Sequence, residues 1–180
     1  RLPDGGRGGP HAIVLFEDES DFVEQLGEGA GTARLQTNGA FRGNVSLAIT
    51  PPQRFSARIP QWNFRIAEKP GANEFRYLRL AWKTEGGQGV MLELADAGKW
   101  PDAQEKRRRY FAGKNTTQWQ AIEVSPDAPT EWRVITVDLW KDNGPFTLTG
   151  IAPTALGGTA FFDGLELLQD VREVEAHSAK

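Results

Sequence analysis

Cysteine is absent from this 180-residue sequence, and histidine is scarce. Without cysteine the chain can form no disulfide, zinc–thiolate site, iron–sulfur cluster or covalent haem attachment. The two histidines, His11 and His177, both lie in segments that we interpret as terminal tails. We therefore expect no catalytic triad built on a histidine of the core.

The sequence also lacks a strong charge of one sign and any long apolar run. Its 21 Lys and Arg residues nearly balance 24 Asp and Glu residues, giving a formal charge of -3. This balance disfavours the basic surface that non-specific nucleic-acid binding requires. The longest apolar run, Ala12 to Phe16, is far shorter than the roughly 20 residues that span a bilayer. We expect neither a nucleic-acid partner nor a membrane span.

Glycine and proline are concentrated at the start of the chain, in RLPDGGRGGP. We interpret residues 1–11 as a flexible linker or tail, because this composition has no apolar periodicity. Residues 170–180 are charged and lack an apolar stripe, which predicts a C-terminal tail. A single β-sandwich domain is expected over residues 12–169. No signal peptide is visible and the chain opens on Arg1, so we expect an excised domain or a mature chain whose targeting sequence is missing.

Short β-rich runs fill the domain and are separated by Gly, Pro, Asn and Asp at spacings of roughly 8–12 residues, as in sandwiches and barrels. The expected strands are Ala12–Phe16, Thr32–Gln36, Val45–Thr50, Phe55–Arg58, Trp62–Ile66, Phe75–Lys83, Val90–Ala95, Arg109–Ala112, Gln118–Val124, Arg133–Trp140, Thr147–Pro153 and Ala160–Leu168. Helices are expected to be nearly absent.

Apolar and polar residues alternate within several of these runs. In RYLRLAWK, Leu78, Leu80 and Trp82 fall on one side of a strand and polar residues fall on the other. The runs VMLELA and VITVDL repeat this alternation. A polar second face is typical of antiparallel sheets. We therefore predict an all-β, antiparallel two-sheet β-sandwich of the jelly-roll type, with GGQG as a hairpin turn.

Three segments resemble the galactose-binding-domain-like β-sandwiches, a jelly-roll group that contains many carbohydrate-binding modules. They are LFEDESDF with RLQTNGAFRGNVSLAIT, then EWRVITVDLW, and finally GTAFFDGLELL. The resemblance implies a non-catalytic module that binds a polysaccharide or oligosaccharide and is secreted, periplasmic or on the cell surface. Fold alone does not settle function, so a structural or interaction module is the alternative.

A second similarity covers most of the domain. The stretches RYLRLAWKTEGGQGVMLELADAGKW, RRYFAGKN and DLWKDNGPFTLTGIAP are similar to domains appended to large multidomain bacterial proteins that carry c-type cytochrome modules. This similarity implies that neighbouring domains of a larger parent protein are partners.

The first resemblance also implies a structural calcium ion between the first and last strands. Glu17 and Asp163 occupy the acidic positions, and Asn38 and Gly43 are the candidate loop ligands. Calcium takes six to eight oxygen ligands, which carboxylates and loop carbonyls can supply. Asp18 is an alternative to Glu17, because neighbouring strand residues point to opposite faces. Alternatively, Glu17, Asp18, Glu19 and Asp21 form only a solvated acidic turn, and Asp163 caps a strand end.

Six tryptophans are many for this length, and sugars pack their C–H groups on aromatic faces. Two groups of side chains are candidates for binding a ligand. Trp100, Tyr110 and Trp119 flank a polar section, residues 96–115, in which we predict a long loop, and Tyr77, Arg79, Lys83 and Glu93 lie on the polar side of central strands. The alternatives are that the aromatic group holds the loop down and that the polar group forms cross-strand ion pairs.

Trp82 and Trp132 are assigned to the core, whereas Trp62 and Trp140 are left open. The run from Lys106 to Arg109 would favour an anionic ligand if it faced the binding surface, and is otherwise a solvated loop.

An enzyme is not expected. A glycosidase would need two carboxylates roughly 5–10 Å apart, for which Glu93 with Asp138 or Glu123 is the candidate pair. No motif joins two such acids, and no glycine-rich phosphate loop is present.

Overall fold

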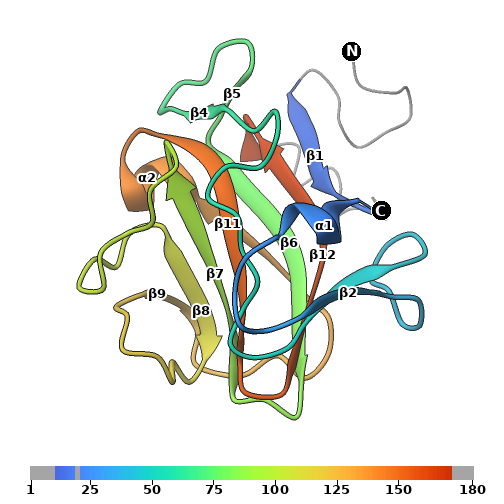
Figure 1. Cartoon of the computed structure of the whole chain (residues 1–180). Helices are drawn as coiled ribbons and strands as arrows, with labels where there is room; N and C mark the ends of the chain where they lie inside the picture. Colours follow the sequence, from blue (N-terminus) through green and yellow to red (C-terminus); the bar gives the residue numbers. More distant parts are fainter. Residues whose placement is uncertain (1–10, 19–20, 172–180) are drawn as a thin grey trace.

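Two β-sheets packed face to face form the protein, as the computed structural model shows for residues 11–18 and 21–171 (Figure 1). The first sheet has the strand order β10-β6-β12-β3-β2, with β1 also paired to β12, and the second has the order β5-β4-β11-β7-β8-β9. The first sheet comprises β1 (Ala12–Phe16), β2 (Ala33–Gln36), β3 (Ser46–Ile49), β6 (Tyr77–Glu85), β10 (Arg133–Asp138) and β12 (Thr159–Leu168). The second comprises β4 (Phe64–Ile66), β5 (Glu74–Phe75), β7 (Gly89–Asp96), β8 (Arg109–Gly113), β9 (Ile122–Ser125) and β11 (Phe146–Leu156). The predicted two-sheet β-sandwich is confirmed.

The core lies between the sheets and follows the alternation seen in the sequence. Leu78, Leu80 and Trp82 of β6 are at most 2% exposed, and they meet inward-facing residues of β7 such as Leu92 and Leu94. Each such side chain stabilises the fold by roughly 1.5–3 kcal/mol relative to an exposed position.

Two glycine-rich turns connect the sheets. The GGQG segment joins β6 of the first sheet to β7 of the second, so the predicted hairpin is wrong. The turn at Gly157 and Gly158 likewise joins β11 to β12, and the two turns pack on each other. Gly158 has φ +57, and a Cβ there would collide with the backbone nitrogen of Gly87. Glycine is therefore required where these two turns meet.

Other differences from the expected elements are local. The sheets are antiparallel except at two edge pairs, β4 with β5 and β8 with β9, which are parallel. The segment expected as a strand at residues 55–58 makes only isolated bridges, among them Ser56 with Ile151.

Two short helices appear, α1 (Phe22–Gln25) and α2 (Leu139–Asn143). The expected strand 133–140 ends early because the Asp138 carboxylate accepts a hydrogen bond from the Lys141 N–H at 2.9 Å and caps α2.

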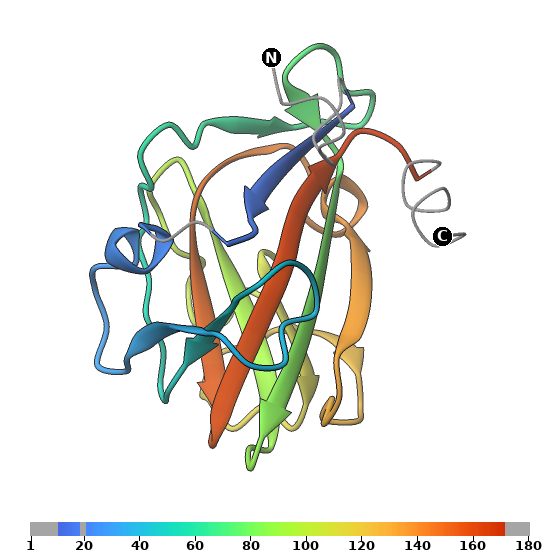
Figure 2. The same ribbon diagram turned by 90° about the vertical axis from the view of Figure 1, so that its right-hand side faces the viewer.

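The connection between β2 and β3 crosses the outer face of the first sheet, in front of β12 in Figure 2. It carries Arg42 and brings that residue onto the last strand. Among the described residues, no helix has the length and apolar character needed to span a membrane.

Candidate functional site

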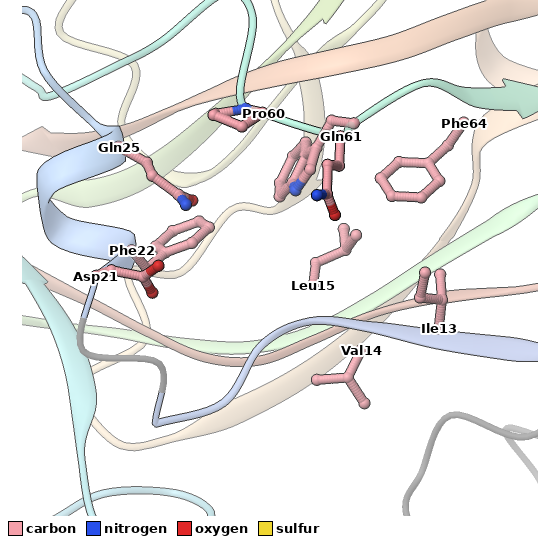
Figure 3. Close-up of a pocket in the computed structure, with 10 residues that line it drawn as sticks. Ile13, Val14, Leu15, Asp21, Phe22, Gln25, Pro60, Gln61 and Phe64 are labelled. Atoms are coloured by element: carbon pink, nitrogen blue, oxygen red, sulfur yellow. The ribbon is translucent and has the colours of Figure 1, made fainter. Parts of the chain in front are cut away.

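A cavity of about 330 Å³ opens between the edges of the two sheets (Figure 3). One side is formed by β1 and α1, and the other by the segment at residues 60–64, which leads into β4. Its volume lies at the lower end of the range for small-ligand sites, roughly 300–1,000 Å³. The structure thus contains a pocket that no sequence motif indicated.

Aromatic rings form the wall of this cavity. The ring centroid of Trp62 lies 6.1 Å from that of Phe22 and 5.8 Å from that of Phe64. Phe22 in turn packs on Phe16, at 5.1 Å, and so ties the wall to the core. Trp62 is only partly buried, so part of its ring is accessible.

A tight turn presents the next part of the wall. Trp62 N–H donates to the Ile59 carbonyl at 3.0 Å, and Ile59 itself is buried. Pro60 follows at the second position of the turn, and Gln61 at the third has φ +70. This is the pattern of a type II turn, in which glycine or asparagine usually takes the third position. A glutamine here keeps a long amide side chain at a strained backbone position.

Polar groups lie on the rim. The side-chain amides of Gln25 and Gln61 extend toward the cavity, and Asp21 lies beside them at the start of α1 (Figure 3). Within residues 11–18 and 21–171, neither amide forms a hydrogen bond with the protein, so both keep unused donors and acceptors.

The predicted binding aromatics do not form one site. Tyr110 is 2% exposed and its hydroxyl donates to Asp142 at 2.9 Å, so its assignment to a ligand is wrong. Burial also raises the Tyr110 pKa, with the Asp142 charge adding to the effect. The cause is strand phase: in β8 the neighbours Arg109 and Phe111 point outward, which turns Tyr110 into the core.

Trp100 and Trp119 lie on the outer side of the second sheet. Trp100 packs edge-on against Phe55, with ring centroids 5.7 Å apart. Trp119 packs on the small cluster that contains Met91 and lies 5.2 Å from the Arg109 guanidinium carbon. Both rings therefore hold loops against the sheet, and ligand binding by either one stays a prediction.

Arg109 organises this outer face. It is 1% exposed and its Nε donates to Glu93 Oε2 at 3.0 Å. Its other nitrogens donate to the main-chain oxygens of Pro101 at 3.0 Å, Glu105 at 3.1 Å and Gln120 at 2.9 Å. The end of the basic run is thus neither a solvated loop nor available to an anionic ligand.

Glu93 is also unavailable, because it is 4% exposed and is paired with Arg109. Moreover, it lies on β7 of the second sheet, whereas Tyr77, Arg79 and Lys83 lie on β6 of the first. The outer faces of the two sheets point in opposite directions, so these four residues cannot line one concave surface. That part of the prediction is wrong, and it failed because alternation does not reveal which sheet a strand joins.

The remaining polar candidates have partners on the first sheet. Arg79 is 5% exposed and lies directly opposite Glu166 of β12. Lys83 Nζ lies 5.2 Å from the ring centroid of Trp132. The Tyr77 ring lies 5.5 Å from the guanidinium carbon of Arg76.

The other tryptophans differ in whether they lie in the core. Trp82 is in the core, as predicted. Trp132 is not: its indole N–H donates to the Gly39 carbonyl at 2.7 Å on the outer face of the first sheet. It shares that side with Val134, two residues further along. Trp140 lies on α2 under the Arg76 guanidinium, whose carbon is 5.0 Å from the ring centroid.

The residues predicted to hold calcium gather around Arg42 instead. Asp163 accepts hydrogen bonds from the backbone N–H groups of Arg42, at 2.9 Å, and Gly164, at 2.8 Å. The Arg42 side chain lies 3.6 Å from Glu17. Burial raises the pKa of Asp163 to about 6, outweighing the amide hydrogen bonds that lower it.

The loop candidates fit a cation no better. Asn38 is exposed, and the backbone at Gly43 packs against the Asp18 carboxylate, which accepts backbone N–H bonds from Asn44 and Val45. No group of three acidic or histidine side chains in the described part of the chain could hold a metal ion. As they stand, these residues do not fit calcium.

The candidate carboxylate pair is not assembled either. Glu93 is paired with Arg109, and Asp138 forms an ion pair with Arg76 at 2.8 Å in the other sheet. Glu123 is exposed on β9, and its neighbour on β8 is Phe111.

Comparison with known proteins supports the fold. No family model matches the chain, and neither does any curated protein. Among solved structures, the family 30 carbohydrate-binding module of a Clostridium thermocellum cellulosomal cellulase aligns with a TM-score of 0.50 and 14% identity, over 88% of this chain and 98% of that one. The chain therefore has a β-sandwich fold that occurs in carbohydrate-binding modules.

Two further structures align less closely. The family 11 carbohydrate-binding module from Clostridium thermocellum, in complex with a β-1,3-1,4-mixed-linked tetrasaccharide, gives a TM-score of 0.48 and 9% identity over 90% of this chain and 98% of that one. The glycoside hydrolase domain of Endo-D from Streptococcus pneumoniae R6 gives a TM-score of 0.47 and 16% identity over 88% of this chain. This chain covers only 21% of that one. These comparisons do not support the similarity to cytochrome-bearing proteins.

Proposed function

We propose that the protein is a non-catalytic carbohydrate-binding module that holds a short glycan segment in the cavity between α1 and the turn at residues 59–62. The observation that carries this proposal is an accessible aromatic wall beside two glutamine amides that form no hydrogen bond with the described part of the chain. The shared fold is compatible with this role but does not choose it.

The chemistry of the cavity suits a sugar. The C–H face of a pyranose can pack on Trp62 and Phe64 while its hydroxyls hydrogen-bond with Gln25 and Gln61. An amide both donates and accepts, as a hydroxyl does, so each glutamine can satisfy a sugar hydroxyl in either sense. A volume of about 330 Å³ accommodates roughly one or two sugar rings rather than a long chain.

The charge around the cavity favours a neutral glycan. Asp21 is acidic, and none of the described residues that line the cavity is Lys or Arg. A uronate or sulfate would meet no charge-assisted donor there. This proposal therefore replaces the anionic ligand suggested by the run from Lys106 to Arg109.

Binding to a glycan array, followed by calorimetry on the best neutral oligosaccharide, tests the proposal. We expect Trp62→Ala to weaken binding at least about 30-fold, as truncation of an aromatic hot spot costs roughly 2 kcal/mol or more. Gln61→Gly removes the amide and suits the positive φ, so it should weaken binding in a folded protein. Trp132→Ala is the matched control, because it removes a tryptophan from the other side of the first sheet.

Equal binding by the wild type and both cavity variants would refute the cavity. Loss of binding in Trp119→Ala alone would move the site to the second sheet's outer face. Release of new reducing ends would refute the non-catalytic role. Absence of any glycan ligand, together with tight association with a flanking domain, would favour an interaction module in a larger parent protein. Secretion or display on the cell surface belongs to the same proposal.

A further inference from the structure

An asparagine followed by a glycine occurs twice in the sequence, and the two pairs lie in very different surroundings. Asn38–Gly39 belongs to the connection between β2 and β3, which crosses the outer face of the first sheet (Figure 2). Asn143–Gly144 lies at the end of α2. This dipeptide has a chemistry of its own, because the amide nitrogen of glycine has no neighbouring side chain to keep it from attacking the asparagine side chain. The surroundings therefore decide which pair can react.

The reacting groups of Asn38 and Gly39 are accessible. Both residues are exposed. In residues 11–18 and 21–171, neither the Asn38 amide nor the Gly39 N–H forms a hydrogen bond. Gly39 has φ +73, and apart from the adjoining residues no heavy atom lies within 4 Å of a Cβ placed there. The attacking nitrogen and the amide carbon can thus approach each other without obstruction.

The same groups are held in place at Asn143. This residue is 8% exposed, and its Oδ1 accepts a hydrogen bond from the Arg108 N–H at 2.6 Å. Its Nδ2 donates to the Tyr110 hydroxyl at 3.0 Å. The Gly144 N–H, which is the group that attacks, donates to the Trp140 carbonyl at 2.7 Å. Reaction at Asn143 requires these hydrogen bonds to break first.

We propose that Asn38 is a site of spontaneous deamidation in the folded protein and that Asn143 is protected from it. The Gly39 nitrogen forms a bond to Cγ of Asn38, and its proton leaves with the side-chain NH₂ group as ammonia, so that a cyclic succinimide results. Water then opens this ring at either carbonyl carbon. Opening at Cγ gives aspartate, and opening at the main-chain carbonyl gives isoaspartate, in which the backbone continues through the former side chain.

Isoaspartate alters the contact that holds this connection on the first sheet. The Gly39 carbonyl accepts a hydrogen bond from the Trp132 indole N–H at 2.7 Å, and the ring centroids of Phe41 and Trp132 lie 6.1 Å apart. The modification lengthens the backbone by one carbon directly before Gly39 and adds a carboxylate there. It thereby moves the Gly39 carbonyl away from the indole. Further along, the Arg42 N–H still donates to Asp163, so the change is confined to the turn.

Incubation of the whole chain at mildly alkaline pH, followed by peptide mapping with mass spectrometry, tests the proposal. In the folded protein, Asn38 should be converted at least about 100-fold faster than Asn143, because opening of a buried hydrogen-bonded network is rare. In concentrated urea the two should react at similar rates, because each is followed by glycine. The denatured sample is therefore the control for the intrinsic reactivity of each pair.

The indole N–H of Trp132 reports the released contact, and its NMR signal can be assigned from its absence in Trp132→Phe. After incubation of the wild type, this proton should exchange with solvent roughly 10-fold faster, as expected when one hydrogen bond is lost. Asn38→Gln is the matched variant, because its longer side chain does not form the succinimide. In that variant the exchange rate should be the same before and after incubation.

Equal rates at Asn38 and Asn143 in the folded protein would overturn the proposal, and so would conversion of Asn38 in urea alone. Conversion of Asn38 without a change at Trp132 would refute the released contact. Glycan binding enters neither measurement, so the outcome is independent of the proposed function.

Discussion

The two outer faces of the sandwich are each organised by one arginine, and the two arginines work differently. Arg109, on the second sheet, meets one carboxylate and several main-chain carbonyls, and its side chain is 2% exposed. Arg42, on the first sheet, meets carboxylates from separate segments, and its side chain is 17% exposed. Arg109 fixes loops, whereas Arg42 neutralises acids.

This difference bears on the proposed position of a ligand. Around Arg109, the charged groups use one another and the loop carbonyls as partners. Around Arg42, the polar groups are likewise engaged in holding strands together. Two amides that form no hydrogen bond with the described part of the chain, those of Gln25 and Gln61, lie between the two faces, at the cavity beside Trp62.

The largest effect is expected from Arg109→Met. This change leaves Glu93 buried without its cation and loop carbonyls without donors, so the free energy of unfolding should fall by about 3–5 kcal/mol. Urea denaturation measures this change in the free energy of unfolding. Arg107→Ala is the control, because Arg107 is exposed and pairs only locally with Glu105; it should leave stability unchanged. Equal losses in the two variants would show that Arg109 is not an anchor.

Removing both charges should cost less than removing one. Arg109→Met combined with Glu93→Leu takes away the buried acid together with its cation, so part of the loss should be recovered, roughly 1–3 kcal/mol. A double-mutant cycle in urea measures this coupling. Additive losses would mean that the main-chain carbonyls, not Glu93, account for the role of Arg109.

Acid should weaken the ion pair at the end of β10. Burial tends to raise the pKa of Asp138, but hydrogen bonds from the Arg76 side chain and the Lys141 N–H outweigh it and hold the pKa below its ordinary value. Stability from this group is therefore present above the ordinary pKa of about 3.8 and is lost as pH falls through the lower folded value. Asp138→Asn, which can still cap α2, should lower stability at pH 7 by about 1 kcal/mol and flatten the acid limb of the stability curve. An unchanged acid limb would contradict the assignment.

The smallest effect concerns backbone strain at the cavity. Gln61→Gly should raise the free energy of unfolding by up to about 1 kcal/mol, because glycine tolerates φ +70. Chemical denaturation measures the gain, and the same variant should bind glycan less well. A loss of stability would mean that the Gln61 side chain has a structural role.

Much of the fold could be predicted from alternation, because polar and apolar side chains must face opposite sides of a strand. In RYLRLAWK and VMLELA, the alternation correctly predicts which side of the strand is buried. Alternation could not show that these strands lie in different sheets, since that depends on where the chain crosses between layers. Consequently Glu93 was grouped with Lys83, although they face opposite directions.

The cavity could not be predicted because its parts are far apart in the sequence. Residues 13–15, 21–25 and 60–64 meet only through packing of the two sheets. One local signal was available: proline followed by glutamine and tryptophan, with the glutamine at a turn position that usually takes glycine. The predictions for Tyr110 and Trp132 were wrong for another reason. An error of one residue in strand phase moves a side chain from the core to the surface, or the reverse.

The pairing of Ala12 with Leu168 places the two ends of the folded unit side by side. A longer polypeptide could therefore contain this unit as an inserted domain, because the chain would enter and leave it at nearly the same point. Because β1 also forms one wall of the cavity, a domain attached at this edge would lie close to the proposed glycan site. The proposed glycan site and the points of attachment to a parent protein would thus lie at the same edge of the molecule.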